Sequence, residues 1–161
     1  MSQPTRFPVF LRVWRSQYPL LILMDRSLNS SDPSVPSDGR KRILVVDDQP
    51  VVLKALRASL EHRGFSVCEA ENGIDGISGA VATRPDLVIL DVAMPGLNGI
   101  EVASILHCLQ PDVPMILNTI YGDHVGKAFG AVFGIRAIVA KSDGVSRLIE
   151  CVRSLLEPDQ P

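Results

Sequence analysis

The chain has 161 residues, a length that suits one domain, and 46% of its residues are hydrophobic, which is enough for one sizeable core. Its formal net charge of -2 gives no sign of the strongly basic surface that nucleic-acid binding requires. The three cysteines lie far apart and form no Cys/His ligand pattern, which argues against a disulfide framework or a zinc site and favours a reducing, cytoplasmic compartment.

Residues 1–41 are expected to be a disordered or non-native extension that lies outside the folded domain. Residues 25–41 consist mainly of Ser, Pro, Asp and charged side chains, a composition typical of a disordered linker. Residues 6–24 are more apolar, but two prolines and two arginines interrupt them. They therefore predict neither a transmembrane helix nor a cleaved signal peptide.

Two origins of residues 6–24 stay open. One is a segment that touches a membrane or a partner protein, with Phe7, Phe10 and Trp14 among its anchors. The other is an upstream start, with Met24 as the true first residue before a short polar lead into the domain. We favour the upstream start because the segment has no steady apolar period.

From residue 42 to residue 157, short apolar runs alternate with helical patterns. The strand candidates are short and rich in β-branched residues, and they lie at 43–46, 66–70, 86–90, 114–118 and 137–140. The helix candidates carry apolar residues at intervals of three or four, and they lie at 51–63, 73–83, 99–109, 123–133 and 144–156. Asn98, with Glu101 three residues on, is a candidate N-cap for the third helix. Five β-α units predict an α/β fold with a doubly wound parallel sheet.

The predicted strands end in polar residues. These residues are mostly acidic or basic, and they are Asp47 and Asp48, Asp91, Asn118 and Thr119, and Lys141, after the first, third, fourth and fifth strands. The carboxyl ends of parallel strands share one rim, where ligands bind. We therefore expect these side chains to converge.

The residue types at this rim favour phosphoryl chemistry with magnesium. Clustered carboxylates repel one another, and a hard divalent cation with oxygen ligands offsets that repulsion. Lys141 supplies a point charge for a phosphoryl oxygen, and Thr119 can donate a hydrogen bond to another. One of the carboxylates can then act as a nucleophile toward phosphorus.

The segments "ILVVDDQP", "DLVILDVAMPGLNGIE", "PMILNTIYGD" and "IVAKSDG" resemble the receiver domain of response regulators in two-component signalling. The resemblance covers residues 42–157, which leaves 158–161 as a tail. It implies a flavodoxin-like (βα)5 fold with strand order 2-1-3-4-5. It also implies a signalling domain rather than an enzyme, which receives a phosphoryl group from a histidine kinase or phosphotransfer protein and assists its own phosphorylation and dephosphorylation.

The resemblance assigns a role to each residue of the rim. Asp91 resembles the phosphoacceptor, which is also a magnesium ligand. Asp48 resembles the direct magnesium ligand, and Asp47 a ligand that acts mainly through water. The third protein ligand corresponds to the backbone carbonyl of Ala93, the switch hydroxyl to Thr119 and the phosphate-binding lysine to Lys141.

The sequence departs from the family pattern at three positions, one of which is Ser142, where a proline is frequent. Ile138 replaces the usual aromatic switch residue, which predicts weak coupling between phosphorylation and output. Ile120 replaces the usual small residue after Thr119. No output domain follows residue 157 in this sequence. We therefore expect a stand-alone receiver that binds a downstream protein or forms a phosphorylation-dependent dimer, with no direct DNA binding.

Three alternatives to a phosphorylation switch stay open. A receiver that switches weakly could serve as a phosphate sink or a scaffold. A fragment of a larger regulator that has lost its effector is a second reading. A magnesium-dependent aspartyl phosphotransferase is a third, but that class usually has an Asp two residues after its nucleophile, where this sequence has Ala93.

Overall fold

The structure is a computed structural model, and it describes residues 39–120 and 133–157. The predicted helix at 123–133 lies outside these residues except for its last position. The predicted tail at 158–161 and nearly all of the predicted extension at 1–41 also lie outside them, so the limits of the domain stay predictions. No helix within the described ranges is long and apolar enough to cross a membrane.

The described elements confirm the five predicted strands and four of the five predicted helices. In chain order they are β1 (Arg42–Val46), α3 (Pro50–Glu61), β2 (Ser66–Ala70), α4 (Gly73–Thr83), β3 (Leu87–Leu90), α5 (Gly99–Leu109), β4 (Met115–Thr119), β5 (Ile135–Ala140), the 3-10 turn η1 (Lys141–Asp143) and α6 (Gly144–Leu156). The ends differ from the predicted ones by at most two residues. The largest differences are two residues each, at the start of β5 and at the end of α3. The apolar run does not mark where β5 starts, and the helical periodicity does not mark where α3 ends.

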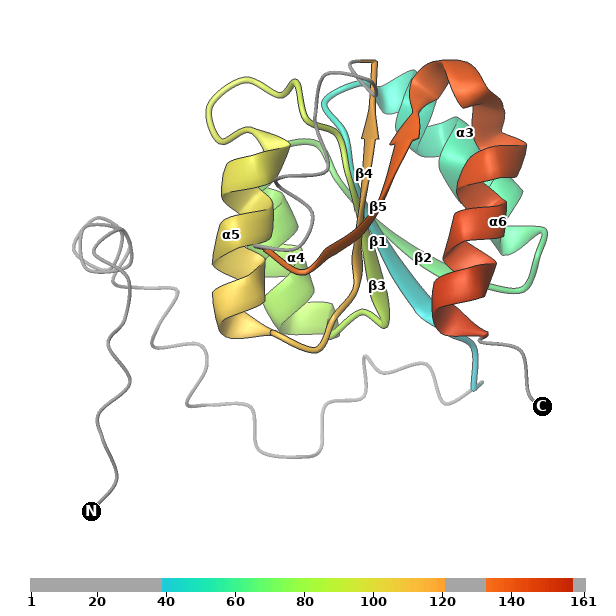
Figure 1. The fold of residues 1–161 in the computed structure, drawn as a ribbon, viewed down its shortest axis with the longest axis horizontal. Helices are drawn as coiled ribbons and strands as arrows, with labels where there is room; N and C mark the ends of the chain where they lie inside the picture. The colour runs from blue at the N-terminus through green and yellow to red at the C-terminus, as the bar shows by residue number, and fades with distance from the viewer. Residues whose placement is uncertain (1–38, 121–132, 158–161) are drawn as a thin grey trace. The chain divides into compact units, whose positions relative to one another are not determined.

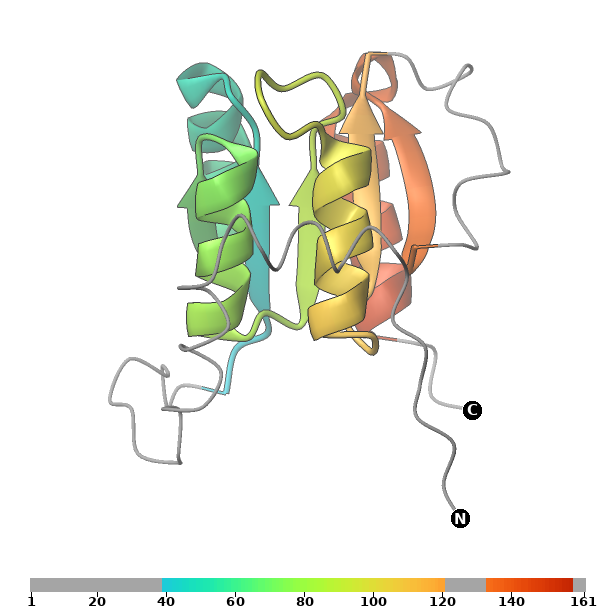
Figure 2. The ribbon, with the colours of Figure 1, turned by 90° about the vertical axis from the view of Figure 1, so that its left-hand side faces the viewer.

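All five strands are parallel and lie in the order β2-β1-β3-β4-β5, as the family resemblance implied. Helices α3 and α6 cover one face of the sheet, and α4 and α5 cover the other (Figure 1). Figure 2 shows the strands side by side behind α4 and α5, with their arrowheads at one edge. This edge, where the strands end, is called the carboxyl edge below. The strands β1, β3 and β4 are apolar almost throughout because helices cover both of their faces.

Successive side chains of β1 point to opposite faces of the sheet. Ile43 and Val45 belong to the core beneath α3 and α6. Leu44 and Val46 point the other way, toward α4, where Gly79 and Gly76 face them. The alternation leaves Asp47 as the first polar residue after four buried apolar ones.

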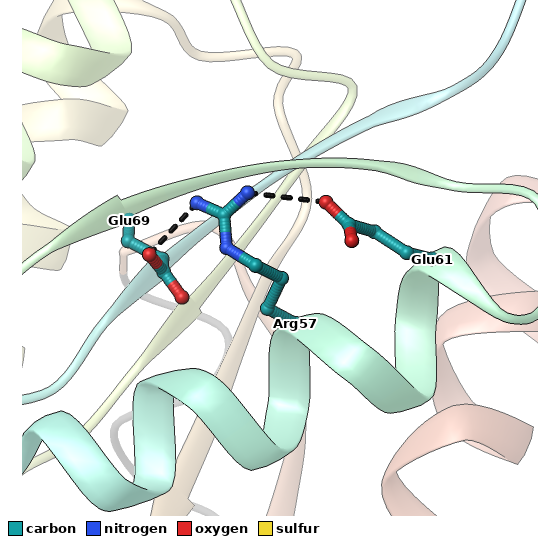
Figure 3. Close-up of polar contacts among 3 residues, drawn as sticks. All are labelled: Arg57, Glu61 and Glu69. Atoms are coloured by element: carbon teal, nitrogen blue, oxygen red, sulfur yellow. Dashed lines mark hydrogen bonds and ion pairs between the residues drawn. The ribbon is translucent and has the colours of Figure 1, made fainter.

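Ion pairs between α3 and the edge strand β2 lie over this strand. Arg57 of α3 reaches over it and pairs with Glu69 at 2.7 Å and with Glu61 at 3.1 Å (Figure 3). The hydrogen bond from Arg57 lowers the pKa of Glu69 below its ordinary value. These pairs are partly exposed, so each contributes at most about 1 kcal/mol. Their charge also discourages pairing of β2 with another strand.

The loop after β3 is fixed at its far end by the start of α5. The side chain of Asn98 accepts hydrogen bonds from the backbone amides of Ile100 and Glu101, each at 3.0 Å. The Glu101 side chain accepts one from the Asn98 amide, also at 3.0 Å. This reciprocal cap confirms Asn98 as the N-cap.

Two glycines of α4 provide a matched pair for testing how closely the helix packs on β1. A Cβ at Gly76 would lie 2.9 Å from both γ carbons of Val46, whereas one at Gly79 would lie 3.5 Å from Leu44. We expect Gly76→Ala to lower the free energy of unfolding by about 1–3 kcal/mol through overpacking. Gly79→Ala should instead raise it by up to about 1 kcal/mol through helix propensity. Urea unfolding measures both, and a shift of the same sign in the two variants would contradict this account.

Candidate functional site

Three carboxylates meet at the carboxyl edge. Asp47 and Asp48 follow β1, Asp91 follows the neighbouring β3, and one carboxylate oxygen of each lies within 4.8 Å of the others. Strand pairing produces this geometry, because Val46 lies opposite Leu90 and the amide of Asp91 donates to the carbonyl of Val46 at 2.8 Å. The structure therefore brings together the acidic residues that the sequence placed at one rim.

Lys141 lies between two of these carboxylates. It is the first residue after β5, and its Nζ is 2.7 Å from Oδ2 of Asp47 and 3.1 Å from Oδ1 of Asp91. Burial acts to lower the pKa of Lys141. The hydrogen bonds and charges of Asp47 and Asp91 outweigh that effect and raise the pKa above its ordinary value. The ammonium therefore stays charged and partly neutralises the cluster.

One ammonium does not satisfy three carboxylates. Burial raises the pKa of Asp91 above its ordinary value, although the hydrogen bond from Lys141 opposes this. The charges of Asp47 and Asp48 raise it further. The carboxylate of Asp91 is thus held in a place where an additional cation would stabilise its charged form.

Asp47 and Asp48 differ in the hydrogen bonds that their carboxylate oxygens accept. Asp47 accepts from the amide of Gln49 through Oδ1 at 2.9 Å and from Lys141 through Oδ2. Oδ1 of Asp48 is buried and has no hydrogen-bond partner among the residues that the structure describes. A buried carboxylate oxygen without a partner is costly. The cluster, with oxygen donors and a net negative charge, therefore fits a hard divalent cation such as Mg²⁺.

Thr119 and Ala93, the other two predicted site residues, lie at or just after the ends of strands at the carboxyl edge, whereas Ile138 lies within β5. Thr119 is the last residue of β4 and is fully buried. Ala93 is exposed in the loop after Asp91. Ile138 lies half-buried in β5, opposite Leu117 of β4.

Sequence reasoning missed the part that Gly99 plays. A Cβ at Gly99 would lie 2.1 Å from the carbonyl oxygen of Asp91, and the Gly99 amide donates to the carbonyl of Val92 at 3.2 Å. No side chain fits there, so the start of α5 packs directly on the backbone of Asp91. The sequence feature that could have predicted this close packing is the glycine directly after the N-cap Asn98.

Residues 43–153 match the family model described as the response regulator receiver domain. The chain therefore belongs to the response-regulator receiver family.

Several proteins of this kind are similar to the chain. Protein PilH of Pseudomonas aeruginosa is 35% identical over 117 residues, which cover 71% of this chain and 97% of PilH. Response regulator MprA of Mycobacterium sp. (strain KMS) is 35% identical over 120 residues, which cover 74% of this chain but 52% of MprA. The chain thus matches about half the length of MprA and nearly all of PilH.

Solved structures agree with this assignment. Response regulator TrrA of Thermotoga maritima, crystallised in complex with Mg²⁺-BeF, is 36% identical, with a TM-score of 0.67 over 72% of this chain and 99% of that one. A CheY-like receiver domain protein of Methanospirillum hungatei is 27% identical, with a TM-score of 0.69 over 73% and 94%. The flavodoxin-like α/β fold and the receiver class are both confirmed.

Removing the charge of Asp48 tests the repulsion within the cluster. With a chelator present at neutral pH, we expect Asp48→Asn to raise the free energy of unfolding by about 1 kcal/mol, because like charges are then fewer. Asp112→Asn, which makes the same change at an exposed residue, should shift it by less than about 0.5 kcal/mol. Equal effects of the two changes in urea unfolding would exclude a strained acidic cluster.

Proposed function

We propose that this receiver domain accepts a phosphoryl group on Asp91 from a histidine kinase or phosphotransfer protein and passes the signal on by protein–protein contact. The observation that carries the proposal is the meeting of Asp47, Asp48, Asp91 and Lys141 at one edge of the sheet. A structural role alone does not explain why three carboxylates gather around one ammonium, because replacing buried ionic clusters with apolar side chains is often neutral or stabilising.

Asp48, Asp91 and the backbone carbonyl of Ala93 would hold Mg²⁺ directly. The unpartnered oxygen of Asp48 supports its direct role. Both oxygens of Asp47 already accept hydrogen bonds, which supports a role for Asp47 mainly through water. When bound, Mg²⁺ neutralises charge that gathers on the phosphoryl oxygens.

The chemical step is a transfer between two nucleophiles. A carboxylate oxygen of Asp91 attacks phosphorus, and the bond from phosphorus to the imidazole nitrogen of the donor phosphohistidine breaks, with its electron pair leaving on the imidazole. The product is an acyl phosphate on Asp91. Lys141, already 3.1 Å from Asp91, would then pair with a phosphoryl oxygen, and the Thr119 hydroxyl would donate to another.

A weakly switching phosphate sink or scaffold is the second candidate, and Ile138 favours it. This side chain lies half-buried beside β4, where an aliphatic group offers no ring to move between buried and exposed rotamers. The aspartyl phosphotransferase reading stays disfavoured because Ala93 offers no general acid. Cytoplasmic location remains a prediction, supported by Cys68, Cys108 and Cys151 being free thiols.

The phosphoacceptor is tested by incubating the protein with acetyl phosphate and Mg²⁺. We expect Asp91→Asn to abolish acid-labile phosphorylation, because an amide is not a nucleophile toward phosphorus. Intact-protein mass spectrometry measures the phosphorylated fraction, with Asp112→Asn as the control that keeps the wild-type value. An equal fraction in Asp91→Asn and wild type would place the acceptor elsewhere.

The metal ligands are tested by calorimetric titration with Mg²⁺ alone. Asp48→Asn should weaken Mg²⁺ binding at least about tenfold, which corresponds to about 1.4 kcal/mol. The change removes the negative charge from the ligand whose oxygen has no hydrogen-bond partner within the described residues. Asp112→Asn should bind as the wild type does. If Asp48→Asn kept wild-type affinity, the assignment of Asp48 as a direct ligand would be wrong.

A further inference from the structure

The start of α4 packs against the start of α5, and the two helices lie side by side on one face of the sheet (Figure 2). Gly73, the first residue of α4, is buried at this contact. A Cβ on Gly73 would lie 2.8 Å from Cβ of Leu97 and 2.9 Å from the Leu97 carbonyl oxygen, and also 2.7 Å from Cγ2 of Val102. Non-bonded carbon atoms normally stay about 3.5–4.0 Å apart. The two segments therefore meet more closely than any side chain at position 73 would allow.

The start of α5 connects this contact with the backbone that leaves β3. Leu97 and Val102 lie on either side of Gly99 in the sequence. The Gly99 amide donates to the carbonyl of Val92 at 3.2 Å, and a Cβ on Gly99 would lie 2.1 Å from the carbonyl oxygen of Asp91. Because these contacts leave no free space, a displacement of the start of α5 also displaces the backbone at Asp91 and Val92.

Two of the proposed metal ligands belong to this stretch of backbone. They are the carboxylate of Asp91 and the carbonyl of Ala93, whereas Asp48 follows a different strand. Mg²⁺ requires nearly ideal octahedral geometry, with oxygens at about 2.0–2.1 Å, and a functional site must be held to within about 0.5 Å. Moving the Leu97 carbonyl oxygen to an ordinary distance from a Cβ would shift the backbone by roughly 0.5 Å. The displacement is thus as large as the tolerance of the site.

We propose that Gly73 is a positioning residue for the Mg²⁺ site. By letting the start of α5 approach α4 so closely, it fixes where Asp91 and the carbonyl of Ala93 lie relative to Asp48. The short contacts of position 73 are with Leu97 and Val102, so Gly73 acts through α5 rather than on the metal. This inference rests on the proposed function, because it assumes that the three ligands hold Mg²⁺.

A role in packing alone leads to a different expectation. A variant that is merely less stable loses its site for every cation when it unfolds, so its affinities for Mg²⁺ and Ca²⁺ fall by the same factor. Ca²⁺ accepts about six to eight oxygens in flexible geometry at about 2.3–2.6 Å. It therefore tolerates a small displacement of the ligands that Mg²⁺ does not. The ratio of the two affinities separates positioning from packing.

The test is calorimetric titration of the full-length protein with Mg²⁺ and, separately, with Ca²⁺. We expect Gly73→Ala to weaken Mg²⁺ binding about tenfold and Ca²⁺ binding by less than about threefold. Gly79→Ala is the matched control, because it makes the same change in the same helix, where a Cβ would lie 3.5 Å from Leu44. This control should bind both cations as the wild type does.

A second variant keeps the proposal testable if Gly73→Ala does not fold. Leu97→Gly introduces no clash and removes the side chain that α4 contacts, so it loosens the start of α5 and should lower the ratio of Mg²⁺ to Ca²⁺ affinity at least about threefold. Wild-type Mg²⁺ affinity in Gly73→Ala, or an equal loss for both cations, would overturn the proposal. So would a wild-type ratio in Leu97→Gly when Gly73→Ala does not fold. A wild-type protein that binds no Mg²⁺ would overturn the proposed function itself, and this inference with it.

Discussion

The ammonium of Lys141 holds the carboxyl edge of this receiver domain together. It lies between Asp47 at the end of β1 and Asp91 at the end of β3, and both carboxylates are nearly fully buried. Without it, the repulsion between these charges would act directly on two central strands. The same contact places a mobile cation beside the proposed acceptor, so stability and the proposed chemistry depend on one side chain.

Two kinds of sequence information predicted most of the fold. The apolar runs of β1 and β3 are bounded by charged residues, and α3, α5 and α6 have a clear apolar period, so the existence of these elements followed from pattern alone. The strand order came from the family resemblance, because no local pattern states which strands are neighbours. The meeting of Asp47, Asp91 and Lys141 followed from the rule that parallel strands end at one edge.

The features that sequence reasoning missed depend on tertiary packing. Gly99 is required because α5 packs directly on the backbone of Asp91, and this contact cannot be inferred from the local sequence. Asn118 was expected at a strand end, but its burial depends on how α3 and α6 pack on that face of the sheet. The exact strand ends shifted by one or two residues because pairing with neighbours, rather than composition, decides them.

The contact between Lys141 and Asp47 joins residues that are 94 positions apart in the chain. Closing so long a loop is entropically costly, so this contact is expected to form after the local β-α units have already assembled. A contact that is absent from the folding transition state slows unfolding rather than speeding folding. We therefore expect the proposed phosphorylation site to slow the unfolding of the native state while leaving the rate of folding nearly unchanged.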